Sequence, residues 1–374
     1  MIKAGIITNI PAPYSLDLFK TITDVEPDID LNIVFSAMSR KNRQWTIDQT
    51  KLKNVHSLDA YIISKRDGDY IRYIHIPKGT WKTLNKINPD ILLVYEYNIT
   101  SVISMIWAKR KNRKFVHVTE GTLWSENNIG FFQKILRRFI LHYSDFCVAC
   151  SSKSKEKLLK WKVSNEKIAT ILLTSDISKY KEIRHERGKK SEINLLYVGS
   201  VERGKGIDLL INSLKYIKTP SKLVVRIVGN GSKKNIDEIQ GLIKKENVEA
   251  DVILTGFLEG EQLLEEYRKA DVFVFPSRSD CYGLVLVEAY SAGIPIVASM
   301  YADGAYDVVE NGVNGIIEDP YDAKAFGSAI TKIINDNAYK INALQMDTEK
   351  FEIATEAKGY IDIIKKYSKE ERDY

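Results

Sequence analysis

The chain has 374 residues, of which 44% are hydrophobic and 28% are charged. This length and apolar content are sufficient for two domains with separate cores, and the sequence has no run of about 18 apolar residues that would predict a membrane span. The net charge of +6 reflects 55 basic and 49 acidic side chains. Because this excess is mild and no aromatic-basic motif accompanies it, the composition argues against a nucleic-acid-binding protein.

The amino terminus and the three cysteines indicate a cytoplasmic protein. The opening MIKAGIITNI predicts a first β-strand and lacks the cleavage site of a signal peptide. Cys147 and Cys150 form a lone CxxC inside an expected strand, with no second ligand pair. We interpret them as small buried hydrophobic residues rather than as a metal or redox site.

The first half of the chain alternates strand-like and helical segments. Helical patterns follow most of the strands, for example at 100–110. The expected strands cover residues 3–8, 31–36, 90–96, 114–120 and 145–150. This alternation predicts a parallel sheet with helices on both faces, in an amino-terminal Rossmann-like domain over residues 1–178.

One helical segment in this half, 131–143, combines apolar and basic residues. Its apolar residues recur at helical spacing, and basic residues stand between them: Phe131, Phe132, Ile135, Leu136, Phe139 and Ile140, with Lys134, Arg137 and Arg138. Two interpretations stay open. We favour an ordinary helix that faces the core. The alternative is a basic amphipathic helix that contacts an anionic membrane, in a protein peripheral to the inner face of the cytoplasmic membrane.

The composition changes at 179–192, which is highly charged and lacks an apolar stripe, so we expect a linker there. A second α/β series then begins, in a carboxy-terminal domain over 193–351. Its expected strands cover residues 193–200, 222–229, 251–256, 271–276 and 294–299. The sequence therefore predicts two doubly wound domains that face a cleft, with ligands bound outside the carboxyl ends of the strands.

The richest chemistry lies in the segment 271–299. A buried strand is followed by a polar loop with Asp280, and Gly283 opens a helix that contains Glu288. Ionised carboxylates suit a hydroxyl-rich ligand because they accept hydrogen bonds from several hydroxyls. The first amides of the helix, at Gly283, Leu284 and Val285, predict an anion site. Sugar hydroxyls and a phosphate together describe a nucleotide sugar, although either carboxylate alone would pass for a surface or capping residue.

This segment resembles the donor-site signature of the retaining family 4 glycosyltransferases, whose two domains form the GT-B fold. The family pattern has two glutamates separated by seven residues, with a glycine three residues after the first. The sequence matches at Gly283, Glu288, Gly293 and Pro295 and departs at the first acid, which is Asp280. The resemblance implies that Glu288 binds the ribose of the donor and that Asp280 binds the transferred sugar. It also implies that a carboxy-terminal helix, 352–374, packs back on the first domain.

The family's phosphate-binding loop corresponds to the segment 197–210. Here the resemblance places Gly199, Ser200 and Lys205 against the donor, with Lys205 neutralising the diphosphate leaving group and Arg203 replacing the basic residue that many members carry at position 200. The same stretch fits the G-x4-G-K spacing of a P-loop. However, Gly206 stands where an ATPase needs a Ser or Thr hydroxyl for Mg²⁺, so we set the ATPase aside.

A dinucleotide dehydrogenase is also disfavoured, because no G-x-G-x-x-G follows the first strand. The Gly229-Asn230-Gly231 turn stops at two glycines. The resemblance implies that Gly229 lines the nucleotide site, and a tight strand-to-helix turn is the plainer interpretation.

The first domain is expected to bind the acceptor. Its opening ITNIPAPYSLDLF resembles that of family members active on bacterial polysaccharide and lipopolysaccharide. Glu120 ends an expected strand at a position where many relatives carry a histidine. We assign Glu120 to acceptor or donor-sugar contact, or alternatively to capping of the next loop, and His117 to the core.

The resemblance therefore implies a retaining transferase that moves a sugar from a UDP- or GDP-sugar to a glycan or lipid-linked acceptor, with no cofactor and no metal. Lys205 and the helix amides would stabilise the leaving group by electrostatic preorganisation. Two alternatives stay open. One is a nucleotide-sugar epimerase, and the other is a non-catalytic subunit that only binds a nucleotide sugar.

Overall fold

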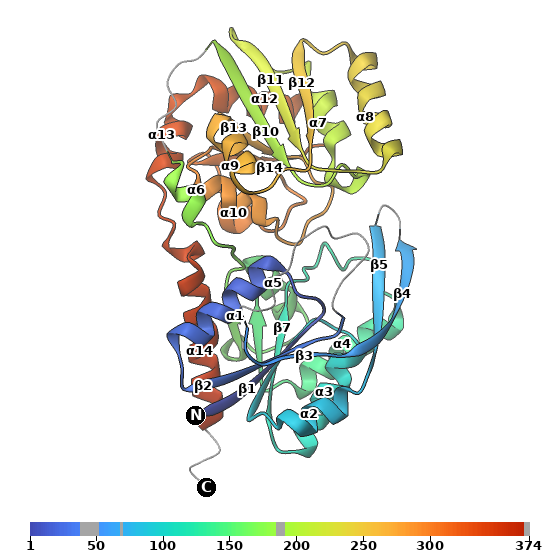
Figure 1. Ribbon diagram of the computed structural model, residues 1–374. Coiled ribbons are helices and arrows are strands. Elements are labelled where there is room, and N and C mark those ends of the chain that lie inside the picture. The colour runs from blue at the N-terminus through green and yellow to red at the C-terminus, as the bar shows by residue number, and fades with distance from the viewer. Residues whose placement is uncertain (38–51, 68–69, 185–190, 370–374) are drawn as a thin grey trace. The chain divides into compact units, whose positions relative to one another are not determined.

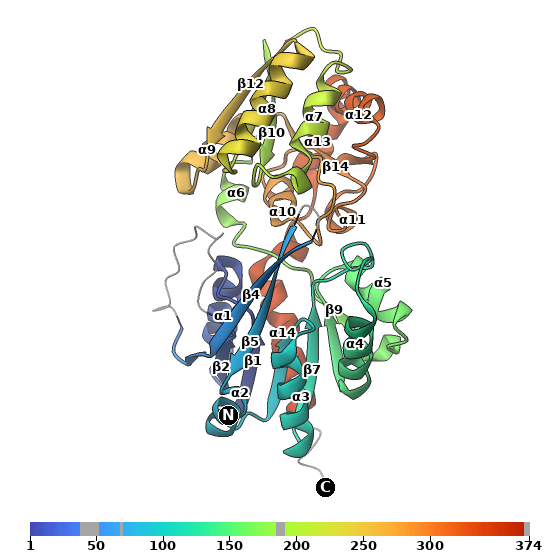
Figure 2. The same ribbon diagram turned by 90° about the vertical axis from the view of Figure 1, so that its right-hand side faces the viewer.

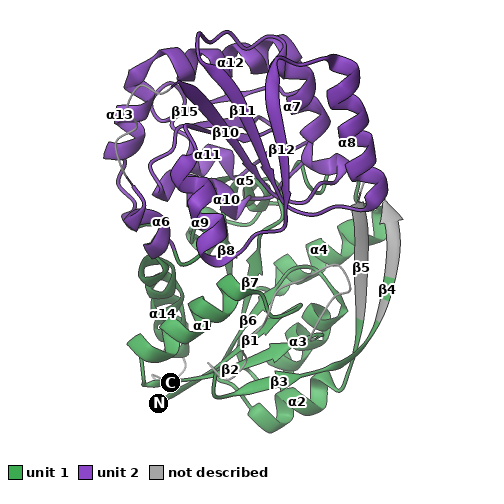
Figure 3. Ribbon diagram, turned by 45° about the horizontal axis from the view of Figure 1, so that its top comes forward, with its two compact units in different colours: residues 1–176, 350–374 green, residues 177–349 purple. Residues whose placement is uncertain are grey.

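The computed structural model describes residues 1–37, 52–67, 70–184 and 191–369, which divide into two compact units (Figure 1). Unit 1 comprises Met1–Asp176 and Lys350–Tyr374, and unit 2 comprises Ile177–Glu349 (Figure 3). The last segment of the chain thus belongs to the same unit as the first. Among the described residues, no helix combines the length and the apolar character needed to span a bilayer.

Among its described residues, unit 1 contains a seven-stranded parallel sheet. The strands lie in the order β3 (Val55–Ser57), β2 (Ile29–Phe35), β1 (Ile2–Thr8), β6 (Ile91–Tyr95), β7 (Lys114–Thr119), β8 (Phe146–Ala149) and β9 (Ile168–Thr170). The central strands are nearly uniform in their apolar character because helices cover both of their faces. All five residues of β6, for example, are buried. The parallel sheet predicted for this half is confirmed.

The helices of unit 1 separate onto two faces, because right-handed crossovers that run in opposite directions along a sheet leave from opposite sides. The pair α1 (Pro13–Val25) and α14 (Ile353–Lys369) packs together on one face, as Figure 1 shows. The other face carries α2 (Thr80–Ile87), α3 (Ile99–Arg110), α4 (Phe131–Tyr143) and α5 (Ser152–Lys160). Because β6 and β7 run parallel, the loops that follow them lie at the same edge of the sheet.

An antiparallel hairpin in unit 1 was not expected from the sequence. It consists of β4 (Asp59–Asp67) and β5 (Tyr70–Lys78), paired from Asp59↔Lys78 to Asp67↔Tyr70. The sequence analysis identified no strand here, because charged residues interrupt the short apolar runs of the segment. The hairpin forms a separate two-stranded sheet beside the parallel one.

Unit 2 is a second doubly wound structure, with a six-stranded parallel sheet among its described residues. Its order is β12 (Ala250–Gly256), β11 (Lys222–Val228), β10 (Glu192–Val198), β13 (Val272–Phe275), β14 (Ile296–Ser299) and β15 (Gly315–Glu318). One face carries α7 (Ile207–Leu214), α8 (Lys233–Glu246) and α12 (Ala323–Asn335), and the other carries α9 (Gly260–Lys269) and α10 (Leu284–Ser291). Two further helices are α11 (Ala305–Val308) and α13 (Asn337–Gln345).

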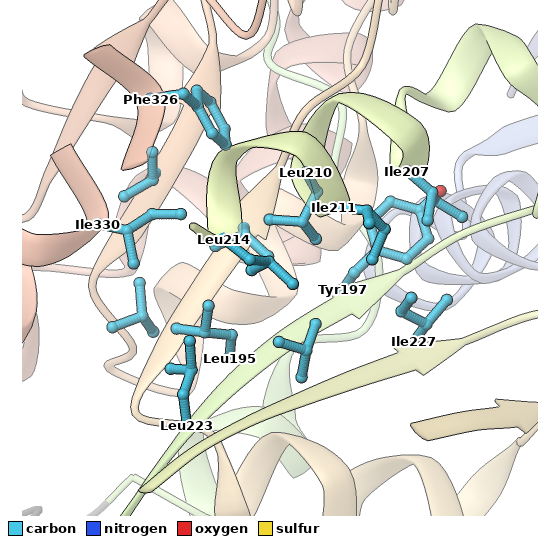
Figure 4. Packing of buried hydrophobic residues seen from close by; sticks show 14 of the residues in the cluster. Leu195, Tyr197, Ile207, Leu210, Ile211, Leu214, Leu223, Ile227, Phe326 and Ile330 are labelled. Atoms are coloured by element: carbon cyan, nitrogen blue, oxygen red, sulfur yellow. The ribbon is translucent and has the colours of Figure 1, made fainter. Parts of the chain in front are cut away.

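The core of unit 2 lies between the sheet and the helices α7 and α12. Leu195 and Tyr197 of β10 pack against Leu210 and Leu214 of α7, and Phe326 of α12 closes the layer (Figure 4). The side chains of Leu195, Leu210 and Phe326 are fully buried. Close packing therefore holds β10 and α7 rigidly. The two ends of the loop that connects β10 to α7 are fixed in the same way.

The segment expected to be a linker, 179–192, begins as part of unit 2. A short helix, α6 (Ser178–Glu182), contacts α9 and α10. Beyond it, the Arg184 guanidinium donates hydrogen bonds to the carbonyls of Ala343 and Met346, at 2.7 and 2.9 Å. Its charged composition therefore reflects surface contacts of unit 2, while 185–190 lie outside the described residues.

The favoured interpretation of 131–143 as a helix facing the core is wrong for most of its apolar residues. Phe131 and Phe132 are 73% and 84% exposed, and Ile135 and Phe139 are also exposed. The buried side of α4 instead carries Ile140, Leu141 and the charged residue Arg137. Helical spacing of apolar residues defines a face but does not show whether the protein or something else covers it.

Three other side chains of unit 1 lie in its core. Cys147 and Cys150 are buried and not joined in a disulfide, and burial raises the pKa of Cys147 to about 12. His117 is fully buried beside Tyr97, with ring centroids 4.3 Å apart. Burial is the main cause that lowers its pKa well below the usual range. These residues therefore act as packed core groups.

Candidate active site

The sheet of unit 2 changes winding direction between β10 and β13. The chain leaves β10 toward β11 and β12, whereas it leaves β13 toward β14 and β15. The helices that follow the two strands, α7 and α10, consequently lie on opposite faces, and the loops after β10 and β13 diverge. Ligands of doubly wound sheets bind outside the carboxyl ends of the strands at this kind of point. The predicted residues Lys205 and Asp280 lie in these two loops.

The structure brings Lys205 and Asp280 together. The Lys205 ammonium nitrogen lies 2.5 Å from Oδ2 of Asp280, and the two side chains are 27% and 15% exposed. The other carboxylate oxygen accepts the Tyr282 N–H at 3.1 Å. Backbone hydrogen bonds from the Asp280 N–H to Tyr301 and from the Asp303 N–H to the Asp280 carbonyl fix the loop. The pair is thus ordered on its acidic side and open to solvent on its basic side.

Glycines allow the loops around this ion pair to touch through their backbones. Gly206 has φ +72°, and a Cβ built on it would lie 1.9 Å from the carbonyl oxygen of Pro276 at the end of β13. A Cβ on Gly229, in the turn after β11, would lie 1.9 Å from the carbonyl oxygen of Gly199. Because neither position can hold a side chain without movement of the backbone, the predicted loops form one compact cluster.

Arg278 joins the same loops and was missed in the sequence. Its N–H donates to the Gly204 carbonyl at 2.9 Å, and its guanidinium donates to the Arg203 carbonyl at 2.6 Å. Two further hydrogen bonds, 2.7 and 2.6 Å long, reach the carboxylate of Asp208 on α7. This two-point pairing raises the pKa of Arg278. It holds the short 3₁₀ turn Arg203–Lys205 in place, and no spacing in the sequence signals it.

The start of α10 lies next to Asp280 in the chain. Gly283, at φ +78°, precedes the first helical residue, Leu284. The amides of Gly283, Leu284 and Val285 therefore occupy the positive end of the helix, where no preceding turn supplies carbonyl acceptors. Such a terminus favours a phosphate or another anion.

Glu288 lies on α10, and its partners differ from those of Asp280. The Tyr267 hydroxyl, on α9, donates to the Glu288 carboxylate at 2.6 Å. Burial raises the pKa of Glu288, and the hydroxyls of Tyr267 and Tyr180 oppose that increase. None of the contacts described for the chain joins Glu288 to Asp280, so the two predicted carboxylates are held separately.

The remaining predicted residues of unit 2 support the loop after β10. The Ser200 carbonyl accepts the buried Tyr197 hydroxyl at 3.0 Å. Arg203 is exposed and lines a cavity of about 230 Å³ together with residues of α7 and α8, among them Asp208 and Asn235. Its side chain is therefore placed against that cavity, and its backbone carbonyl is bound by Arg278.

Glu120, the predicted residue of unit 1, follows β7 and contacts a neighbouring carboxylate. Its N–H donates to Oε1 of Glu96 at 2.6 Å, and its carbonyl accepts the Ser154 hydroxyl at 3.0 Å. Glu96 has φ +63°, a left-handed conformation that is uncommon for a residue with a side chain. Burial raises the pKa of Glu96, and Lys157 opposes that shift. Left-handed backbone at the end of a strand is often found at functional sites.

A buried cluster of charges supports this end of the unit 1 sheet, and the sequence did not reveal it. Arg137 donates two hydrogen bonds to Glu126, at 2.8 and 3.0 Å. The Lys157 ammonium lies 2.9 Å from the Thr119 hydroxyl and 3.5 Å from Glu126. Both cations lie over the Tyr97 ring, 4.7 and 4.9 Å from its centroid. The partners are far apart in sequence, so no local pattern could have indicated them.

Comparison with known proteins relates the carboxy-terminal part of the chain to a family. Residues 179–350 match the family described as Glycosyl transferases group 1. The matched region contains Lys205, Asp280 and Glu288.

The relatives found are distant and share part of the chain. The uncharacterized glycosyltransferase MJ1607 of Methanocaldococcus jannaschii is 29% identical over 175 residues, which are 46% of this chain and 44% of that protein. The capsular polysaccharide biosynthesis glycosyltransferase CapM of Staphylococcus aureus is 28% identical over 229 residues, 55% of this chain and 59% of CapM. The chain thus spans about half the length of the curated relatives it matches.

Similarity in structure extends along the whole chain. The crystal structure of Anabaena HepE in complex with UDP has a TM-score of 0.76 and 17% identity, and the match covers 98% of this chain and 100% of that one. At this identity the likeness shows a shared fold, and it confirms the predicted α/β architecture of the GT-B type.

Proposed function

We propose that the protein is a retaining glycosyltransferase that transfers a sugar from a UDP- or GDP-sugar to a glycan or lipid-linked acceptor. The observation that carries the proposal is the Lys205–Asp280 ion pair, 2.5 Å long, at the switch point of unit 2. A cation for the diphosphate and a carboxylate for the sugar hydroxyls stand side by side where a doubly wound sheet binds its ligand. The match of residues 179–350 to the family described as Glycosyl transferases group 1 supports the same reaction class.

In this proposal the donor replaces the ion pair. The diphosphate takes the Lys205 ammonium, and the amides of Gly283 and Leu284 add hydrogen bonds to the same negative charge. Asp280 is released to accept hydrogen bonds from the hydroxyls of the sugar. Glu288 accepts the ribose hydroxyls in place of the Tyr267 hydroxyl that it binds in the structure.

We further propose that the transfer needs no metal ion. Lys205 and the positive end of α10 supply the charge that would otherwise come from a divalent cation, because the bond that breaks leaves a negatively charged diphosphate. The departing phosphate then assists deprotonation of the acceptor on the same face of the sugar, so the anomeric configuration is retained. Activity that is unchanged by EDTA would support this part of the proposal, and activity restored by Mg²⁺ or Mn²⁺ after EDTA would contradict it.

The acceptor is proposed to meet residues of unit 1, with Glu120 in contact with the acceptor or the transferred sugar. CapM is named for capsular polysaccharide biosynthesis, which supports a role in bacterial polysaccharide or lipopolysaccharide synthesis. Such a role would place the protein at the inner face of the cytoplasmic membrane, where lipid-linked acceptors are found.

A donor screen tests the proposal. The purified protein is incubated with UDP- and GDP-sugars, and release of free nucleotide is followed for the wild type and for Lys205→Ala, with Lys218→Ala as a control at an exposed lysine of the same unit. We expect slow hydrolysis of one donor, about a hundredfold slower in Lys205→Ala and unchanged in Lys218→Ala. Conversion of the donor to an epimer would indicate the epimerase instead. Binding of a donor with no turnover, even with membrane extracts as a source of acceptor, would indicate a binding subunit.

A further inference from the structure

The exposed face of α4 is apolar along its length. Four exposed apolar side chains lie on this face, over more than two turns: Phe131, Phe132, Ile135 and Phe139. Tyr143, at the end of the helix, extends this apolar stripe. Monomeric proteins seldom expose a contiguous set of large apolar side chains unless the surface binds something. Leu123, which precedes the helix, is also exposed and lines a cavity together with Lys134.

Basic residues border this stripe on one side. In the helix order, Lys134 and Arg138 are adjacent to Phe131 and Ile135, and both are exposed. Arg137, which the sequence had grouped with them, points into unit 1 and is bound to Glu126. The stripe and its basic border are therefore distinct surfaces of the same helix, and α4 contains no acidic residue.

Lysines of α5 and of the turn that follows it extend the basic border; the backbones of α4 and α5 are drawn in Figure 2. Lys134 and Arg138 line a surface cavity of about 540 Å³ together with Lys160 and Lys162. A neighbouring cavity of about 820 Å³ is lined by Arg138, Phe139, Lys162 and Lys167, so it joins the basic border to the apolar stripe. We call the two cavities together the basic groove.

The basic groove is not neutralised by the protein. Of the residues that line it, Glu126 carries the acidic charge, and that carboxylate is already engaged by Arg137 and Lys157. Within the described part of the chain, Lys134, Arg138, Lys160 and Lys162 form no ion pair. The groove therefore attracts an anion, and its size exceeds that of one phosphate group.

We propose that the apolar stripe of α4 and the basic groove form a docking surface for a bilayer that contains anionic phospholipid. The aromatic side chains would enter the boundary between headgroups and acyl chains, and the cations would lie over the lipid phosphates. Charge complementarity favours a bilayer as the occupant. Its anionic headgroups match the cations of the basic groove, and its apolar interior matches the apolar stripe of α4. The proposal concerns unit 1 alone and is independent of sugar transfer.

Vesicle flotation of the full chain, without any nucleotide sugar, tests the proposal. Binding is compared on phosphatidylcholine vesicles with and without phosphatidylglycerol. The first variant is Lys134→Glu with Arg138→Glu, and the second is Phe131→Ser with Phe132→Ser. A matched control, Lys244→Glu with Lys324→Glu, reverses two exposed charges of unit 2. Thermal melting of each variant shows whether the fold is intact.

We expect the wild type and the control to bind vesicles that contain phosphatidylglycerol and not those of phosphatidylcholine alone. The charge-reversed variant of α4 should bind at least about 25-fold more weakly, since each lost cation near an anionic surface accounts for about fivefold. The serine variant should bind at least about tenfold more weakly, because it loses two large apolar side chains. The wild-type binding should also fall with added salt.

Three results would overturn the proposal. The first is wild-type binding that does not depend on phosphatidylglycerol, and the second is equal binding by the control and the α4 variants. The third is a wild type that fails to float but forms a dimer disrupted by Phe131→Ser with Phe132→Ser, because the stripe would then be covered by a second copy. If the serine variant unfolds, a Phe132→Trp variant replaces it, and quenching of its fluorescence by brominated phosphatidylglycerol reports insertion.

Discussion

Unit 2 presents Lys205 and Asp280 at the tips of two loops, partly open to solvent, whereas unit 1 encloses Glu126, Arg137 and Lys157 with 13% or less of each side chain exposed. In the first arrangement the Lys205 ammonium can exchange its partner for a ligand anion, because 27% of its side chain is exposed. The second arrangement does not allow such an exchange, because a buried charge left without its partner is strongly destabilising. The charged pair of unit 2 therefore suits exchange of a partner for a ligand, whereas the charged cluster of unit 1 serves as a fixed scaffold.

The largest effect should come from the buried cluster of unit 1. Replacement Arg137→Met leaves Glu126 buried without its two hydrogen bonds, and we expect the free energy of unfolding to fall by about 3–5 kcal/mol. Urea denaturation measures this change. The control Lys109→Met removes the partly exposed ion pair with Asp145 and should cost about 1 kcal/mol or less. Equal losses in the two variants would remove the distinction between buried and exchangeable charge.

The next effect concerns the loops of unit 2. In Gly206→Ala the new Cβ would meet the Pro276 carbonyl and must push the loops after β10 and β13 apart. We expect about 1–3 kcal/mol of destabilisation and, since a displacement of about 1 Å at a site can cost a hundredfold in rate, a comparable loss of donor turnover.

The control for this variant is Gly241→Ala on α8, where a Cβ meets nothing within 4 Å. Alanine there should raise the stability slightly, by up to about 1 kcal/mol, and leave turnover unchanged. Full turnover in Gly206→Ala would show that contact between these loops is not required.

A smaller effect should separate Glu288 from Asp280. Because burial raises the pKa of Glu288, its carboxyl stays protonated to a higher pH than an ordinary glutamate, and the charged form that accepts ribose hydroxyls is lost earlier on acidification. We expect kcat/KM for the donor to fall as the pH drops through this raised value. Glu288→Gln should remove that pH step and lower kcat/KM about tenfold at pH 8. A pH step that persists in Glu288→Gln would assign it to another group.

Much of the fold could be predicted from the sequence, because buried parallel strands leave a strong local signal. The runs that became β1, β6 and β13 are short, apolar and bounded by turns. The hairpin of β4 and β5 was not predicted, because charged residues interrupt the short apolar runs of its strands. For α4, the spacing gave the helix but not the side that faces outward, which only the packing of Ile140 and the Arg137–Glu126 pair decides.

The candidate site divides in a similar way. Lys205, Asp280 and Glu288 could be nominated because each lies in a short motif with glycines that bring loops together. Arg278 could not, since its partner Asp208 is 70 residues away. The cluster around Glu96 and Glu126 likewise depends on contacts between separate elements of unit 1, for which the sequence holds no spacing signal.

Calorimetric titration of wild type, Lys205→Ala and Asp280→Asn, first with the free nucleoside diphosphate and then with the sugar nucleotide chosen by the donor screen, tests the central claim most directly. Lys205→Ala should bind both ligands more weakly. Asp280→Asn should bind the free diphosphate more tightly than the wild type, because Lys205 no longer has a competing partner, and should lose the added affinity for the sugar nucleotide. Weaker binding of the free diphosphate by Asp280→Asn would contradict the exchange of the ion pair for the donor.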